Sequence, residues 1–217
     1  MTRSAPALRA GADRPASARI GAEYPSPLVR FLATPAAFVA TNWAAILLAL
    51  TVVGLIPALT AATRTTTDLR CHADRAFRET LRSGVALLRR DWIVSLAVWA
   101  LLAVAAGDAL ILSELASGGV RVFLAGLAVP PTWLVASFLS AYVVLAAGSD
   151  PAAGRREIAG RALVLMTRKP LQALLVPAVI VAVCPLWVLA PLTIAIGFSL
   201  TPFLVARFWG RVDALLV

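Results

Sequence analysis

The sequence predicts an all-α, polytopic membrane protein with about five transmembrane helices and two amphipathic helices on its cytoplasmic face. Hydrophobic residues make up 60% of the chain and charged residues 14%, and the mean hydropathy is +0.87. Uncharged stretches of about 20 residues recur, and as helices each would be about 30 Å long, the thickness of the hydrocarbon core. Arginines gather between these stretches, as expected for loops that flank transmembrane spans.

The first predicted span covers residues 38–62, and it is free of charged residues. The second, residues 92–112, begins at Trp92 directly after the basic pair Arg89 and Arg90, which is typical of an interfacial anchor. The third covers residues 122–147.

The third predicted span contains the pair Pro130-Pro131, which removes two backbone donors and should kink it or break its first turns. The last two spans, residues 171–187 and 190–208, share an uncharged run that is too long for one crossing. The prolines between them favour a tight turn there.

The distribution of cations predicts the orientation. Seven arginines lie in residues 64–90, and four arginines with Lys169 lie in residues 149–170, so both loops are expected inside. An odd number of spans then places the N-terminus outside and the C-terminus in the cytoplasm. Residues 1–30 are interpreted as a disordered tail rich in Arg, Ala and Pro. Its five arginines oppose export, but the twelve cations of the inner loops outnumber them.

Both inner loops contain an amphipathic pattern. In residues 73–90 the apolar side chains recur at spacings of three and four, which predicts a helix on the inner membrane surface that ends at Arg89 and Arg90. Its expected apolar face is formed by Ala73, Phe77, Leu81, Val85 and Leu88. Residues 155–168 repeat the pattern with Ile158, Ala162, Leu165 and Met166.

Four residues within the spans are candidate functional positions. Gly54 and Pro57 would kink the first span and free a backbone carbonyl, as in transporters, although both are also common in ordinary transmembrane helices. Asp108 is a carboxylate inside a predicted span, where it would bind a proton or cation or reach the outer headgroups. Asn42 would join Asp108 and Glu114 in an outer vestibule, or cap a helix or bond to a neighbour.

Motifs for enzymatic chemistry are missing from the sequence. It contains no Ser-His-Asp set, Walker motif or glycine-rich phosphate loop, so no catalytic activity and no cofactor are predicted. Cys71 and His72 are too few to close a metal site, and a disulfide between Cys71 and Cys184 is not expected. The net charge of +9 is attributed to anionic lipid headgroups rather than nucleic acid, because the cations flank apolar spans.

A family resemblance rests on the first half of the chain. Asn42-Trp43 opens the first span, Gly54-Leu55-Ile56-Pro57-Ala58 closes it, and a basic loop with Phe77 and Arg89-Arg90 leads into the second. This pattern resembles the YesL-like bacterial integral membrane proteins, a domain family of unknown function. The likeness covers residues 38–217. The transmembrane domain is taken as residues 31–217.

The resemblance implies a multi-pass protein of the bacterial cytoplasmic membrane, whose genes often lie beside sugar uptake systems. The implied function is a non-enzymatic accessory or partner subunit of an ABC-type carbohydrate uptake system. Its partners would be permease subunits or a second copy, through small-residue faces such as Ala97, Ala100, Ala103 and Ala106-Gly107. The alternatives are a stand-alone small channel or transporter, or a membrane-bound regulator that uses residues 73–90.

Overall fold

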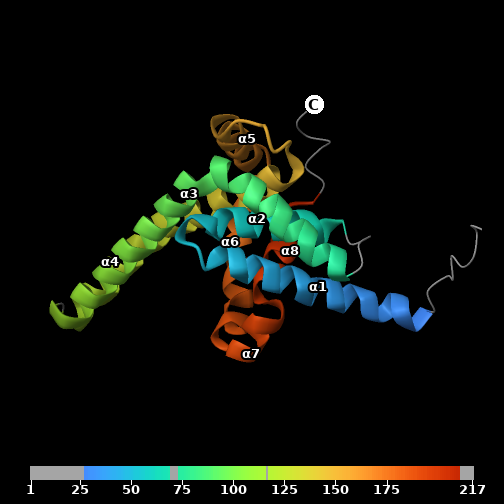
Figure 1. The fold of residues 1–217 in the computed structure, drawn as a ribbon. Helices are drawn as coiled ribbons and strands as arrows, with labels where there is room; N and C mark the ends of the chain where they lie inside the picture. Colours follow the sequence, from blue (N-terminus) through green and yellow to red (C-terminus); the bar gives the residue numbers. More distant parts are fainter. Residues whose placement is uncertain (1–26, 69–72, 116, 211–217) are drawn as a thin grey trace, which may run out of the picture.

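The computed structural model describes residues 27–68, 73–115 and 117–210, and every regular element in these ranges is helical (Figure 1). The all-α class is therefore confirmed. The elements are α1 (Pro27–Ala49), the 3-10 turn η2 (Val52–Gly54), α2 (Leu55–Thr67), α3 (Ala73–Leu115), α4 (Gly118–Gly148), α5 (Arg155–Arg168), α6 (Pro170–Val188), α7 (Ala190–Leu192), the π-helical turn η3 (Thr193–Gly197) and α8 (Phe198–Trp209). Residues 1–26 of the expected tail, together with Cys71 and His72, lie outside the described residues.

Several helices fit a membrane-embedded protein. Within the described ranges, Arg75–Glu114, Gly118–Gly148 and Ala190–Trp209 are each long and apolar enough to cross a membrane. A fourth span results if the pair Arg155–Arg168 and Pro170–Pro185, which is bent by 104°, counts as one. The expected count of five spans is not confirmed.

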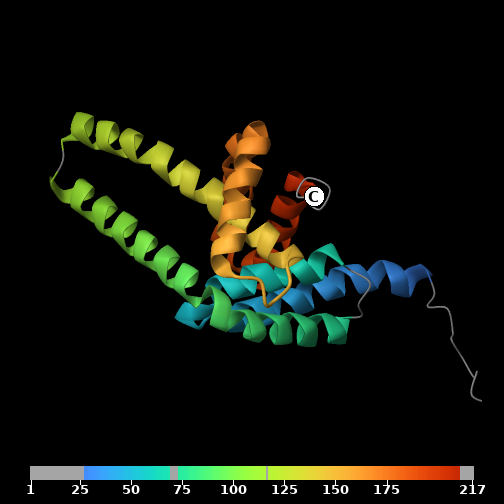
Figure 2. The same cartoon turned by 90° about the horizontal axis from the view of Figure 1, so that it is seen from above.

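The first predicted span, residues 38–62, is corrected to two helices. Helix α1 ends at Ala49, the chain turns through η2, and α2 runs back beside α1 (Figures 1 and 2). The Thr51 hydroxyl donates to the Leu48 carbonyl at 2.7 Å and stabilises the turn. The two helices bury small side chains, which lets them pack closely: Ala44, Ala45, Ala58, Ala61 and Ala62. Mean hydropathy is the same for a straight and a folded segment, so it could not reveal the turn.

Helices α3 and α4 form the second hairpin. The first half of α3 packs against α1 and α2, and the second half continues without a break into an apolar arm. Helix α4 returns from the tip and passes through Pro130-Pro131 without interruption. At the tip, Arg121 donates from Nε to the Leu112 carbonyl at 3.1 Å and from Nη2 to the Ser113 carbonyl at 2.8 Å. These bonds satisfy carbonyls at the end of α3 that lack intrahelical partners.

The third hairpin consists of α6 and the run from α7 to α8. Lys169, at the bend between α5 and α6, donates from Nζ to the Trp209 carbonyl at 2.8 Å. This bond joins the start of α6 to the end of α8. Trp209 is fully buried, and its indole Nε1 donates to the Ser140 hydroxyl of α4 at 3.2 Å. Thus the open ends of the third hairpin are tied to α4.

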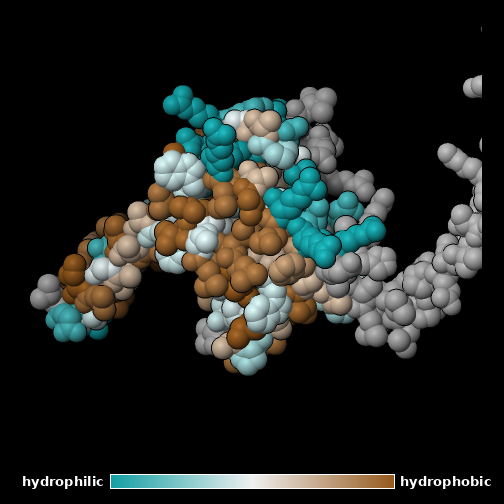
Figure 3. All heavy atoms as spheres, viewed as in Figure 1, coloured by the Kyte–Doolittle hydropathy of each residue, from teal (hydrophilic) through white to brown (hydrophobic). Residues whose placement is uncertain are grey.

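The core lies where the open ends of the hairpins meet. Its buried side chains come from α2, α4, α5, α6 and α8, and they include Ile56, Tyr142, Ile158, Leu165, Val176 and Trp209. Helix α5 buries Ile158, Ala162 and Leu165, the face predicted for it. Hydrophilic residues gather over α5 and the first half of α3, whereas apolar residues cover the arms and the region around α6 (Figure 3).

Candidate functional site

Asn42 lies inside the fold, in contact with the π-helical turn η3 that precedes α8. Its side chain is fully buried. The amide Nδ2 donates to the carbonyls of Thr193 and Ile194 at 3.1 and 2.7 Å. Its Oδ1 accepts from the backbone N–H groups of Phe198 and Ser199 at 2.6 and 3.2 Å. One side chain of α1 thus bonds to backbone groups in the π-helical turn η3 and at the start of α8, which agrees with the expected bond to a neighbour and not with an outer vestibule.

Gly54 and Pro57 shape the turn into α2 rather than a kink within a span. A Cβ on Gly54 would collide with the Leu48 carbonyl and the Thr51 hydroxyl. Pro57 lies in the first turn of α2, where a missing N–H breaks no intrahelical bond. The Ile56 N–H donates to the Ser95 hydroxyl of α3 at 3.1 Å, so α3 satisfies a free donor at the start of α2.

A buried charged cluster lies at the base of the arms. Asp91 of α3 is fully buried, and Arg90 donates to both of its carboxylate oxygens, from Nε and Nη2, at 2.9 Å each. The Tyr142 hydroxyl of α4 donates to Asp91 Oδ1 at 2.7 Å. Arg90 Nη1 also donates to the Asp150 carbonyl at 3.4 Å, in the segment between α4 and α5. The cluster therefore joins α3, α4 and the segment that follows α4.

The predicted amphipathic face of residues 73–90 is displaced on the structure. Phe77, Leu81 and Leu88 are only partly buried, Val85 is 55% exposed, and Arg89 is exposed. The row that packs against α1 and α2 consists of Ala76, Thr80, Gly84, Leu87, Asp91 and Ser95. Gly84 allows a close approach within this row, because a Cβ on it would collide with a methyl group of Leu48. The row mixes apolar residues with Thr80, Asp91 and Ser95, so a search for apolar periodicity could not find it.

Asp108 is exposed on the second half of α3, two residues after the exposed Ala106 and close to the tip. The structure does not bring it together with Asn42, which is buried. Around Asp108 the arms are coated with large exposed apolar side chains, including Leu101, Leu102, Val104, Leu110, Phe123 and Leu127. The two arms meet at the tip, diverge toward the body and make almost no contact with each other (Figure 2). They form an open, V-shaped apolar surface.

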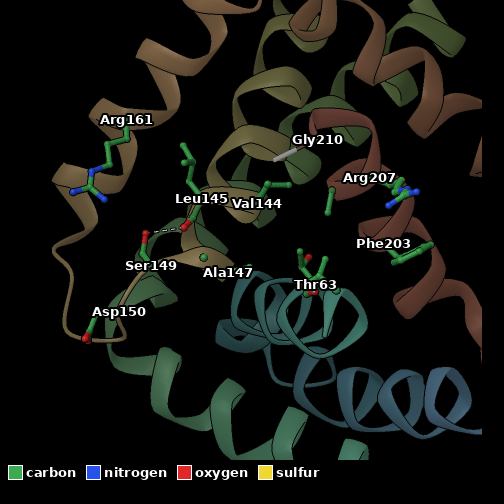
Figure 4. A pocket seen from close by; sticks show the side chains of 13 residues that line it. Thr63, Val144, Leu145, Ala147, Ser149, Asp150, Arg161, Phe203, Arg207 and Gly210 are labelled. Atoms are coloured by element: carbon green, nitrogen blue, oxygen red, sulfur yellow. Dashed lines mark hydrogen bonds between the residues drawn. The ribbon is translucent and has the colours of Figure 1, made fainter. Parts of the chain in front are cut away.

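A basic cavity of about 830 Å³ opens between α2, the end of α4, α5 and α8. Arg161 of α5 and Arg207 of α8 lie on opposite sides of it, with Thr63 between them (Figure 4). Ser149 and Asp150 also line it, and the Ser149 hydroxyl donates to the Leu145 carbonyl at 2.7 Å. Such a cavity offers guanidinium donors and hydroxyl groups to an anionic or polar ligand.

Comparisons with protein-family models, with curated proteins and with solved structures find no match to the chain. The resemblance to the YesL-like proteins therefore stays a prediction. Three features were missed in the sequence: the Asp91 cluster, the basic cavity and the open V. A signal existed only for Asp91 and Tyr142, since a carboxylate and a phenol beside or within apolar spans require polar partners.

Proposed function

We propose that the protein is a non-enzymatic membrane subunit whose α3–α4 arms receive a partner protein within the bilayer. The observation that carries the proposal is the open V, because its apolar side chains find almost no partners among the described residues. The proposed partner is a permease subunit of an ABC-type uptake system. Carbohydrate is the proposed solute class, and this part rests on the YesL-like resemblance alone.

Small residues on the arms support close packing with a partner helix. A Cβ added to Gly107 or Gly126 would meet no atom of the described chain within 4 Å. Glycine and alanine let two helix backbones approach in a membrane, where packing rather than hydrophobicity drives association. Lipid alone would also coat the arms, so the decisive property is the response of partner binding to added bulk at these glycines.

We expect the double variant Gly107→Leu/Gly126→Leu to lose the partner while it stays folded. Tagged protein would be purified gently from its native membrane, and the proteins recovered at fixed stoichiometry would be identified. A loss of about 1.4 kcal/mol of binding free energy raises the Kd for the partner about tenfold, and less partner is then recovered. Gly160→Leu on α5, where a Cβ also meets no atom within 4 Å, is the matched control and should retain the partner. A protein recovered alone as a discrete oligomer would contradict the proposal and favour a stand-alone channel or transporter.

The proposed location is the bacterial cytoplasmic membrane, with both termini in the cytoplasm. This departs from the expected external N-terminus, and the hairpin arrangement supports the change. A hairpin returns the chain to the side from which it came, so three hairpins give an even number of crossings. The basic segments at residues 64–90 and 149–170 then lie on one side with the arginines of residues 1–30.

Cysteine labelling in intact cells tests this orientation. In a variant without Cys71 and Cys184, a cysteine placed at the exposed tip by Ser117→Cys should react with a membrane-impermeant reagent. A cysteine placed by Ala152→Cys, which is exposed between α4 and α5, should not react until the membrane is opened. A fluorescent protein that folds only in the cytoplasm should be bright when fused to the N-terminus. Labelling of Ala152→Cys alone would reverse the proposed orientation.

A further inference from the structure

A second, apolar cavity follows the basic cavity along the same three helices, and the two share no lining residue. On α4, residues 136, 139, 140 and 143 line the apolar cavity, and residues 144, 147 and 148 line the basic one. With the exception of Leu145, which also lines the basic cavity, these positions recur every three to four residues and follow one side of the helix. On α2 the succession is the same, with Leu55 and Leu59 at the apolar cavity and Thr63 and Thr67 at the basic one. The two cavities therefore lie end to end between α2, α4 and α8.

The apolar part has a volume of about 350 Å³ and is lined by side chains of five helices. Val98 of α3, Val143 of α4, Ile180 of α6 and Val205 of α8 are among them. A third cavity of about 330 Å³ shares Ala136 and Ile180 with it and extends the apolar channel between α4 and α6. An elongated apolar space of this kind suits a hydrocarbon chain and offers little to a soluble ion.

The basic cavity is lined by charged and polar groups, in contrast to the apolar cavity. Arg207 is exposed and forms no hydrogen bond or ion pair within the described part of the chain. Arg161 bonds to Glu157 Oε1 at 2.6 Å through Nη2, which leaves its other donors available. The Asp150 carboxylate also lines the cavity, where its Oδ1 accepts from the Ala152 N–H at 2.8 Å. Among the lining residues two guanidinium groups face one carboxylate, and because Glu157 pairs with Arg161 from outside the lining, Arg207 supplies the unpaired positive charge of the rim, on the side where hydrophilic residues gather (Figures 3 and 4).

We propose that this cleft binds one anionic phospholipid. Its phosphate-containing headgroup lies between Arg161 and Arg207, and one acyl chain occupies the apolar part between α2, α4 and α8. The polarity of the cleft changes along its length in the same sense as the polarity of a lipid. Guanidinium groups suit phosphate because they donate several hydrogen bonds from a fixed plane. A free phosphate would use the rim alone and leave the apolar part without an occupant.

The test is a titration of the full chain in neutral detergent with phosphatidylglycerol, and separately with phosphatidylcholine, followed by native mass spectrometry. We expect a single phosphatidylglycerol to bind more tightly than phosphatidylcholine. The double variant Arg161→Gln/Arg207→Gln should weaken phosphatidylglycerol about tenfold, consistent with the loss of two cations beside an anionic headgroup. Arg156→Gln, an exposed residue of α5 that does not line the cavity, is the matched control and should change binding less than twofold, about the scatter of such a titration.

The acyl chain and the source of the phosphate are tested separately. Ala136→Phe fills the apolar part, so it should weaken long-chain phosphatidylglycerol and leave a short-chain analogue unaffected. Inorganic phosphate should not displace the lipid. Displacement by inorganic phosphate would show a free-phosphate site and overturn the proposal. Equal weakening by Arg156→Gln and the double variant would also overturn it, because the basic surface would then attract the lipid without a defined site.

Discussion

Asn42→Leu is expected to cost the fold about 4 kcal/mol, because four backbone groups each lose a hydrogen bond worth about 1 kcal/mol. Those groups are the carbonyls of Thr193 and Ile194 and the N–H groups of Phe198 and Ser199. They lie in and just after the π-helical turn η3, where the regular α-helical hydrogen-bond pattern is interrupted. The thermal midpoint of the detergent-solubilised protein, followed by tryptophan fluorescence, should fall by about 10 °C.

Thr41→Val is the control for this prediction. Thr41 precedes Asn42, is also fully buried, and its hydroxyl has no hydrogen-bond partner among the described residues. Replacing an unpartnered hydroxyl with a methyl group of the same shape should leave the midpoint unchanged or raise it. If Asn42→Leu were as stable as Thr41→Val, the bonds of the amide to residues 193–199 would contribute nothing to stability.

Asp91→Ala is expected to cost about 3–5 kcal/mol, because it leaves a buried guanidinium without its carboxylate. The side chain of Arg90 is only 8% exposed and that of Asp91 is fully buried, so water cannot take over the lost bonds. The variant should also loosen the contact between α3 and α4 at Tyr142. Hydrogen exchange at the base of both arms should therefore speed up, together with a lower thermal midpoint.

A triple variant separates the loss of charge balance from the loss of packing. Arg90→Met, Asp91→Leu and Tyr142→Phe together remove every charged or hydroxyl group of the cluster while keeping similar volumes. Removing a whole buried ion pair in this way is often neutral, so most of the stability lost in Asp91→Ala should return. Tyr142→Phe alone should cost about 1 kcal/mol, the value of one hydrogen bond. If the triple variant were no more stable than Asp91→Ala, the hydrogen-bonded arrangement of the three side chains, and not only their charge balance, would stabilise the fold.

The all-helical class, with helices that fit a membrane-embedded protein, could be predicted from the sequence, because the length of an apolar segment can be read from consecutive residues. From α4 onward the helices also occupy the ranges in which the last three spans were expected. The turn between α1 and α2 could not be predicted in this way. Gly54 and Pro57 were noticed, but a kink and a full reversal call for the same residue types. In the proposed topology, this one difference changes the number of crossings from odd to even.

The site residues show a similar division. Asn42 stood out because a buried amide in an apolar helix needs partners, yet its partners lie more than 150 residues away in sequence. Arg90 was grouped with Arg89 as a surface cation, although only Arg89 is exposed. Its carboxylate partner is adjacent in sequence, but the burial of the pair depends on Tyr142 and on the segment after α4. Long-range packing, which no spacing rule records, decides which of two neighbouring arginines is buried.

Because α3 is continuous, a tilt of its first half also moves its second half. Its 43 residues form one rod about 65 Å long, with the Asp91 cluster near the middle as a pivot. The arm beyond the pivot is about 36 Å long, so a tilt of α3 by about 10° would move the tip by about 6 Å. Between the pivot and the tip the two arms make almost no contact, and at the tip Arg121 couples α4 to the motion. The part of α3 before the pivot is about 27 Å long, so the tip moves about 1.3 times as far as the start of the helix.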